Sequence, residues 1–204
     1  MDLFDPQQNH RRSIRLKGYD YTQVGAYFVT AVTWHRDCLF GDFADGEVQL
    51  NRAGQIIRDE WMNLAQRFKF VELGAFVVMP NHLHGILLFH GVGATRPVLS
   101  GAPSGQTLSH HETTAGIDGS PLPSPRGPNP ASLGALIGEF KSRATKRLWK
   151  IPSLTRTPIW QRNYYERILR NEKEVSATWD YIESNPSLWD DDDENQHKTV
   201  PAGS

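Results

Sequence analysis

Two histidines one residue apart, in Pro80-Asn81-His82-Leu83-His84, have the types and spacing best suited to chemistry. Side chains alternate between the two faces of a β-strand, so His82 and His84 would point the same way, about 7 Å apart at ~3.3 Å per residue. Two imidazoles placed like this can converge on one metal ion or phosphate. The alternative is a pair of half-exposed histidines on an edge strand. A zinc site would need a third strong ligand, and the single cysteine, Cys38, lies far upstream.

A tyrosine and an asparagine four residues apart form the second candidate, in the segment Asp180-Tyr181-Ile182-Glu183-Ser184-Asn185. On a helix, Tyr181 and Asn185 would share a face. A phenol can act as a covalent nucleophile. An amide oxygen suits a hard divalent ion such as Mg²⁺ or Mn²⁺ better than it suits zinc. Alternatively, Tyr181 is a packing residue and Asn185 ends the helix before Pro186.

Arginines alternate with aromatic residues in the third candidate, residues 159–170. Arg162, Arg167 and Arg170 could contact phosphates while neighbouring rings stack on the bases of a single strand. The alternative is an aromatic core strand with a solvated basic face. Tyr164 and Tyr165 are rivals to Tyr181 as nucleophiles. Further candidates for DNA-backbone contacts lie in an N-terminal basic arm and on a predicted helix: Arg11, Arg12, Arg15, Lys141, Arg143, Lys146 and Arg147.

The elements that must position these residues follow from hydrophobic periodicity. Runs of β-branched and aromatic residues predict strands at 27–34, 70–73, 75–79 and 82–89, and a short strand within 159–169. Apolar residues at helical spacing predict helices over 52–68, from an N-cap at Ser132 to about 148, and from Asn171 to Ser184. The order β-α-β-β-α-β-α predicts an α+β fold in which helices pack on one face of an antiparallel sheet.

Net charge alone argues against a nucleic-acid binder, because 22 basic and 23 acidic residues nearly cancel. The cancellation is between neighbouring segments. Residues 131–174 carry 10 basic and 4 acidic groups, whereas residues 175–204 carry 1 and 7. A basic surface is therefore compatible with the composition.

Composition also divides the chain of 204 residues. We expect a basic arm at 1–18, one catalytic domain at 19–189 and an acidic disordered tail at 190–204. Residues 91–130 hold 7 Gly, 7 Pro and 5 Ser and are predicted to be a disordered insertion in that domain; a linker between two domains is the alternative. With one cysteine, no signal peptide and no long apolar run, membrane and secreted classes are excluded and a cytoplasmic, nucleoid-associated location is expected.

Taken together, three ordered motifs resemble the IS200/IS605-like single-tyrosine transposases, and among these the REP-associated tyrosine transposases. The motifs are Met79–Ile86 (MPNHLHGI), Ile159–Glu174 (IWQRNYYERILRNEKE) and Asp180–Pro186 (DYIESNP), with further likeness over residues 11–33. The resemblance implies a ferredoxin-like fold with an HUH site, where His82 and His84 are the histidines and Leu83 is the bulky apolar U. The family's Tyr-x-x-x-Gln/Asn pattern matches Tyr181 and Asn185, and does not match Tyr164 or Tyr165.

What the resemblance implies for activity is single-strand DNA cleavage and strand transfer, at hairpin-associated sites. His82, His84 and Asn185 would hold Mg²⁺ or Mn²⁺, and Tyr181 would form a 5′-phosphotyrosine link, with no small-molecule cofactor. Family members act as monomers or as homodimers. Two other hypotheses are open from the residues: a non-cleaving protein that binds hairpin single-stranded DNA, and a zinc or iron enzyme that uses His-x-His in a jelly roll.

Overall fold

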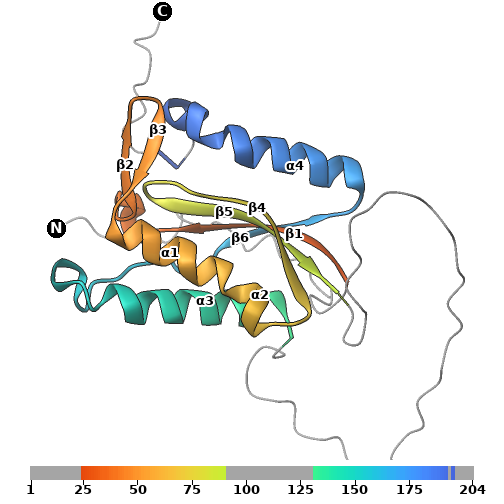
Figure 1. The fold of residues 1–204 in the computed structure, drawn as a ribbon, viewed down its shortest axis with the longest axis horizontal. Coiled ribbons are helices and arrows are strands. Elements are labelled where there is room, and N and C mark those ends of the chain that lie inside the picture. The colour runs from red at the N-terminus through yellow and green to blue at the C-terminus, as the bar shows by residue number, and fades with distance from the viewer. Residues whose placement is uncertain (1–23, 91–130, 193, 196–204) are drawn as a thin grey trace, which may run out of the picture.

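The computed structural model describes residues 24–90, 131–192, 194 and 195 (Figure 1). The basic arm with Arg11, Arg12 and Arg15, the Gly/Pro/Ser-rich segment 91–130 and residues 193 and 196–204 of the expected tail lie outside these residues. Within the described part of the chain, no helix is long and apolar enough to cross a bilayer.

Four antiparallel strands form the main sheet, in the order β4-β5-β1-β6. Their bounds are Gly25–Val32 (β1), Val71–Val78 (β4), His82–Phe89 (β5) and Tyr165–Leu169 (β6). Counted along the chain, the order is fourth, first, third, second, with a helical connection after the first strand and after the third, which is the ferredoxin-like arrangement. The predicted α+β class is confirmed. A separate hairpin of β2 (Gly41–Ala44) and β3 (Glu47–Leu50) was not predicted.

The α-helices other than α2 begin where a side-chain cap satisfies their first amides. The bounds are Arg52–Met62 (α1), Leu64–Arg67 (α2), Leu133–Leu148 (α3) and Glu172–Ser184 (α4), with 3₁₀ turns at Trp34–Arg36 (η1), Pro152–Leu154 (η2) and Asn185–Asp191 (η3). As predicted, Ser132 accepts a hydrogen bond from Ala135 N, and Asn171 accepts one from Glu174 N. The single helix predicted over 52–68 is instead two, which meet at Asn63.

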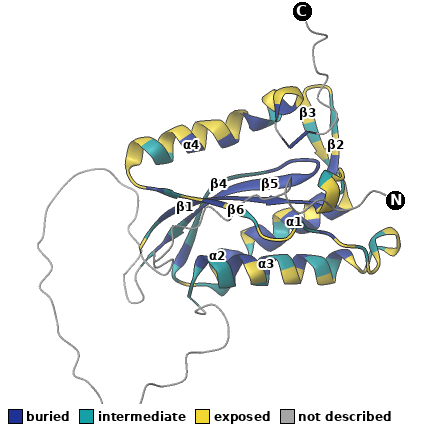
Figure 2. Ribbon diagram, turned by 180° about the vertical axis from the view of Figure 1, so that it is seen from behind, coloured by how far each residue is buried: buried dark blue, intermediate teal, exposed yellow. Residues whose placement is uncertain are grey.

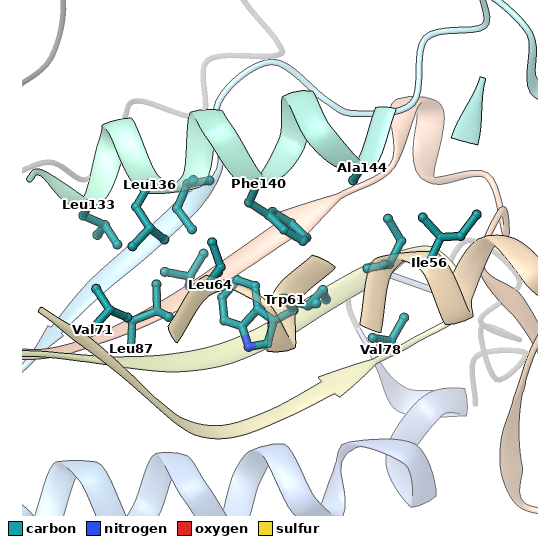
Figure 3. Packing of buried hydrophobic residues seen from close by; sticks show 14 of the residues in the cluster. Ile56, Trp61, Leu64, Val71, Val78, Leu87, Leu133, Leu136, Phe140 and Ala144 are labelled. Atoms are coloured by element: carbon teal, nitrogen blue, oxygen red, sulfur yellow. The ribbon is translucent and has the colours of Figure 1, made fainter. Parts of the chain in front are cut away.

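The sheet is covered on both faces (Figures 1 and 2). The main core fills the face under α1, α2 and α3, where Trp61, Leu136 and Phe140 pack against Leu87 of the central strand β5 (Figure 3). Helix α4 lies on the opposite face, over a smaller cluster that includes Ile86 and Ile182. The prediction that helices pack on one face of the sheet is therefore correct for α1, α2 and α3. Helix α4 forms a third layer on the opposite face.

Gly85 on β5 is required by the close packing of the main core. A Cβ at this position would overlap the ring atom Cζ2 of Trp61, which is fully buried. We expect Gly85→Ala to lower the free energy of unfolding by about 1–3 kcal/mol, because neither the ring nor the central strand has room to move. Chemical denaturation monitored by circular dichroism measures this change.

The matched control is Gly138→Ala on α3, where an added Cβ has no neighbour within 4 Å. That change should raise the free energy of unfolding by about 0.5–1 kcal/mol, through helix propensity alone. Equal effects of the two substitutions would contradict this account of the core.

Candidate metal centre and tyrosine site

The two histidines lie on the face of β5 that α4 covers. His82, His84 and Ile86 point to this face, while Leu83 and Leu87 point into the main core. The imidazole rings are 4.4 Å apart between centroids, and the exposed fractions are 0% for His82 and 4% for His84. The interpretation of half-exposed histidines on an edge strand is therefore wrong: β5 is an inner strand and both rings are buried.

Each ring is oriented through its Nδ1 atom. His82 Nδ1 lies 2.8 Å from Asn81 Oδ1, whose amide nitrogen donates elsewhere, so Nδ1 carries the proton and donates. His84 Nδ1 lies 2.8 Å from the Thr30 hydroxyl on β1. A hydrogen bond at Nδ1 leaves Nε2 as the ligand atom, which is the usual way in which proteins orient metal-binding histidines.

Burial lowers the pKa of both histidines to about 3. Desolvation is the largest cause for each; the charge of Arg36 lowers the pKa of His82 further, and that of His82 lowers the pKa of His84. The opposing effects, from Asn185 on His82 and from Asp192 and Glu194 on His84, are each smaller than the effect of burial. Both imidazoles are thus neutral at neutral pH, as a metal ligand must be.

Tyr181 lies on α4 directly over this pair. Its hydroxyl is 3.3 Å from His84 Nε2, and its ring is 5.4 Å from the ring of His84 between centroids. Buried Thr178 and Ile182, on the same helix, fix α4 to the sheet, while Tyr181 remains 43% exposed. The predicted nucleophile and the two histidines thus meet within one chain, with the phenol between the imidazoles and solvent.

Asn185, the predicted oxygen ligand, is buried where α4 passes into η3. Its Nδ2 donates to Asp192 Oδ2 at 3.1 Å. Two buried atoms at this place have no hydrogen-bond partner among the described residues, His82 Nε2 and Asn185 Oδ1. Both accept rather than donate, so a cation would satisfy them and a further acceptor would not.

A buried acidic side chain that was not among the predicted ligands completes the group. Asp192 is buried, its Oδ2 lies 3.8 Å from His82 Nε2, and ligand atoms of His82, His84 and Asp192 all lie within 4.8 Å of one another. These three residues could hold a metal ion. The run Asp190–Glu194 suggested a solvated tail; the signal against that view was Trp189, whose buried ring stacks on His82 at 6.1 Å between centroids.

Part of the segment that was expected to be a solvated tail packs against the site. Residues 190–192, 194 and 195 are described, and Asp192, Glu194 and Asn195 are buried. Asn81 Nδ2 donates to the carbonyl of Glu194 at 2.7 Å, and the Glu194 carboxylate pairs with Arg36 at 2.6 Å. These contacts are made by residues more than 100 positions away in the sequence, so the local composition of the segment could not predict them.

The basic residues predicted on α3 lie on the other side of the sheet from the histidines. Lys141 donates to the carbonyls of Gln161 and Asn163, and burial lowers its pKa to about 8. Arg147 pairs with the buried carboxylate of Glu60 at 2.9 Å. The remaining two, Arg143 and Lys146, are exposed, and Arg143 pairs with Glu139 on its own helix.

Of the basic residues around β6, Arg167 contacts the helix that carries Tyr181. Arg162, Arg167 and Arg170 are all exposed. Arg167 stands on the α4 face of β6, opposite Phe28 in register, and donates to Thr178 on α4 at 2.8 Å. Phe28 in turn contacts the rings of Tyr165 and Tyr181, both at 6.1 Å between centroids.

Several solved structures are similar to this chain, and no protein-family model matches the chain. One is a REP-associated tyrosine transposase bound to a REP hairpin, with 19% identity, a TM-score of 0.49 and coverage of 82% of this chain and 70% of the other. Another is a candidate transposase from Deinococcus radiodurans R1, with 19% identity, a TM-score of 0.40 and coverage of 83% and 96%.

Sequence comparison gives a nearer relative, an uncharacterized protein of Haemophilus influenzae. The two chains are 34% identical over 184 residues, which is 90% of this chain and 92% of the other. Identity at this level over nearly the full length of both is shared descent and not a local motif. The chain belongs to the same protein family as this Haemophilus influenzae protein.

Proposed function

We propose that the chain is a single-tyrosine transposase, which cuts and rejoins single-stranded DNA beside hairpins of the REP type. One observation carries the proposal: the Tyr181 hydroxyl lies 3.3 Å from Nε2 of His84, at a pair of neutral, buried imidazoles. The three sequence motifs that resemble this transposase class contain these same residues. The jelly-roll alternative does not apply, because the main sheet is a ferredoxin-like layer.

In the proposed reaction Tyr181 attacks a phosphodiester in line. The Tyr181 oxygen forms a bond to phosphorus while the bond from phosphorus to the 3′ oxygen breaks. The proton that the phenol loses is balanced by the proton that the departing 3′ oxygen gains. The products are a 5′-phosphotyrosine and a free 3′-OH, and a second 3′-OH can reverse the step without ATP.

His82, His84 and an oxygen ligand would hold Mg²⁺ or Mn²⁺ at the site. A phenol with a pKa near 10 is only about one part in a thousand ionised at pH 7. A divalent ion at this place would polarise the phosphate and favour the ionised phenol. The chain's own contribution is position: Asn81 and Thr30 orient the two imidazoles, and Thr178 and Ile182 hold α4 so that Tyr181 faces them.

One chain supplies all of these groups, which favours a monomer with Tyr181 acting in cis over a dimer that exchanges helices. DNA backbone contacts near the scissile bond are proposed for Arg162, Arg167 and Arg170, around β6. The α3 residues Lys141, Arg143, Lys146 and Arg147 could contact only DNA that passes the other face. Such a protein would work on the nucleoid, in the cytoplasm.

Tyr181→Phe should abolish covalent capture of DNA, because it removes the attacking oxygen and keeps the ring. The assay incubates the full chain and Mn²⁺ with a 3′-labelled single strand that carries a hairpin, and then detects the label on the protein in denaturing gels. Only the 3′ portion becomes attached in the proposed reaction. Tyr165→Phe is the matched control: this tyrosine is also exposed and also contacts Phe28, and it should react like the wild type.

Wild-type protein that binds the hairpin strand and yields no adduct would instead establish a non-cleaving hairpin-binding protein. Adduct formation by Tyr181→Phe that is lost in Tyr165→Phe would move the nucleophile to β6.

Arg167→Ala should weaken binding of a short unstructured single strand and reduce the slope of log K against log[salt] by about 1, since one phosphate contact is lost. Fluorescence anisotropy over a salt series measures both. Arg143→Ala, on the far face, should leave both values unchanged. Thr178→Val removes the hydrogen bond to Arg167 without removing its charge, and should preserve the slope. A reduced slope in Arg143→Ala alone would place the strand on the α3 face.

A further inference from the structure

We propose that Asp192 is a ligand of the divalent ion, so that a carboxylate from the segment after α4 joins His82 and His84 at the metal. The inference deepens the proposed function and rests on it. It departs from the motif resemblance, which supplies an oxygen ligand from Asn185 alone. Asn185 then holds Asp192 in place through Nδ2, and its own Oδ1 is available as a further oxygen ligand.

The three groups are close enough to converge on one ion after small side-chain movements. Ligand atoms that surround an ion at about 2.1 Å are about 3.0 Å apart when adjacent and about 4.2 Å apart when opposite. His82 Nε2 and Asp192 Oδ2 are 3.8 Å apart, and the three ligand atoms lie within 4.8 Å of one another. At 3.8 Å, the histidine and the carboxylate are too far apart for a direct hydrogen bond.

The unsatisfied atoms indicate that something positive belongs between these groups. His82 Nε2 and Asn185 Oδ1 are buried and have no hydrogen-bond partner among the described residues, although such an atom costs about 1–3 kcal/mol. The atoms that meet here are an imidazole nitrogen of His82, the amide oxygen of Asn185 and a carboxylate oxygen of Asp192. All three carry lone pairs that a cation can accept as ligands. Two imidazoles with a carboxylate are also a common ligand set for divalent transition metals.

Asp192 is held in position through both of its oxygens. Oδ1 accepts a hydrogen bond from Glu194 N at 2.6 Å, and Oδ2 accepts one from Asn185 Nδ2 at 3.1 Å. Asn81 also fixes the segment that carries Asp192. Its Nδ2 donates to the Glu194 carbonyl, and its Oδ1 accepts from His82 Nδ1. One asparagine thereby positions a histidine ligand and the segment that carries Asp192.

Two consequences follow for the loaded site. A divalent ion with two neutral imidazoles and one carboxylate keeps a net charge of +1, which still attracts a phosphate. Binding of the ion should also stabilise the fold, because the ligands converge only in the native arrangement of β5 and η3.

The test measures Mn²⁺ binding to the full chain, by electron paramagnetic resonance of free Mn²⁺ and by the rise in Tm that Mn²⁺ produces. We expect wild type to bind and to gain Tm, and Asp192→Ala to lose affinity at least 10-fold together with most of the Tm gain. Asp190→Ala is the matched control, since this neighbour in the same acidic run is exposed; it should match wild type. His82→Ala sets the level expected for loss of a ligand.

Asp192→Asn keeps the shape and one of the two accepted hydrogen bonds. It covers the case in which Asp192→Ala fails to fold without metal, and it should also bind more weakly. The inference would be overturned if the Asp192 variant that folds bound Mn²⁺ as tightly as wild type while His82→Ala lost affinity. It would also be overturned if wild type did not bind Mn²⁺. Neither result decides whether Tyr181 forms an adduct with DNA, which the labelled-strand assay determines separately.

Discussion

The burial of two neutral imidazoles on the central strand β5 is the constraint on which the rest of the site depends. Burial costs free energy for a polar ring unless its nitrogens are satisfied. Asn81 and Thr30 satisfy one nitrogen on each ring, and the covering segment from α4 to Asn195 excludes water from the other side. The same burial that keeps the rings neutral also leaves Nε2 of His84 beside Tyr181 and Nε2 of His82 beside Asp192.

The alternation of side chains on β5 divides the molecule into a face for stability and a face for chemistry. Leu83 and Leu87 join the main core under α1 and α3, where Trp61 and Phe140 leave no room even for a Cβ on Gly85. His82 and His84, one residue out of phase, belong to the α4 face. A one-residue change of register would exchange the two sets, so the tight core also fixes which residues face Tyr181.

Local rules predicted what depends on local sequence. The period of two on residues 82–89 gave the shared face of the histidines, and the caps at Ser132 and Asn171 gave the starts of two helices. The face chosen by α4 and the ion pairs that occupy Arg147 are tertiary outcomes, so they were not predictable from periodicity. Asp192 was missed for the same reason. An acidic run resembles a solvated tail until Arg36 and Asn81, both distant in sequence, bring it to the site.

One continuous stretch supplies four of the described groups that lie over the histidines. Tyr181, Asn185, Trp189 and Asp192 follow one another at intervals of three or four residues, through the end of α4 and the turn η3. Because these side chains share one backbone, a displacement of α4 would carry the phenol, the Asn185 amide and the Asp192 carboxylate together. The spacing of Tyr181, Asn185 and Asp192 is thus set within one segment, while the packing of α4 on the sheet sets their distance from the two histidines. A site built in this way can tolerate change in the rest of the α4 surface, provided that Thr178 and Ile182 keep the helix seated on the sheet.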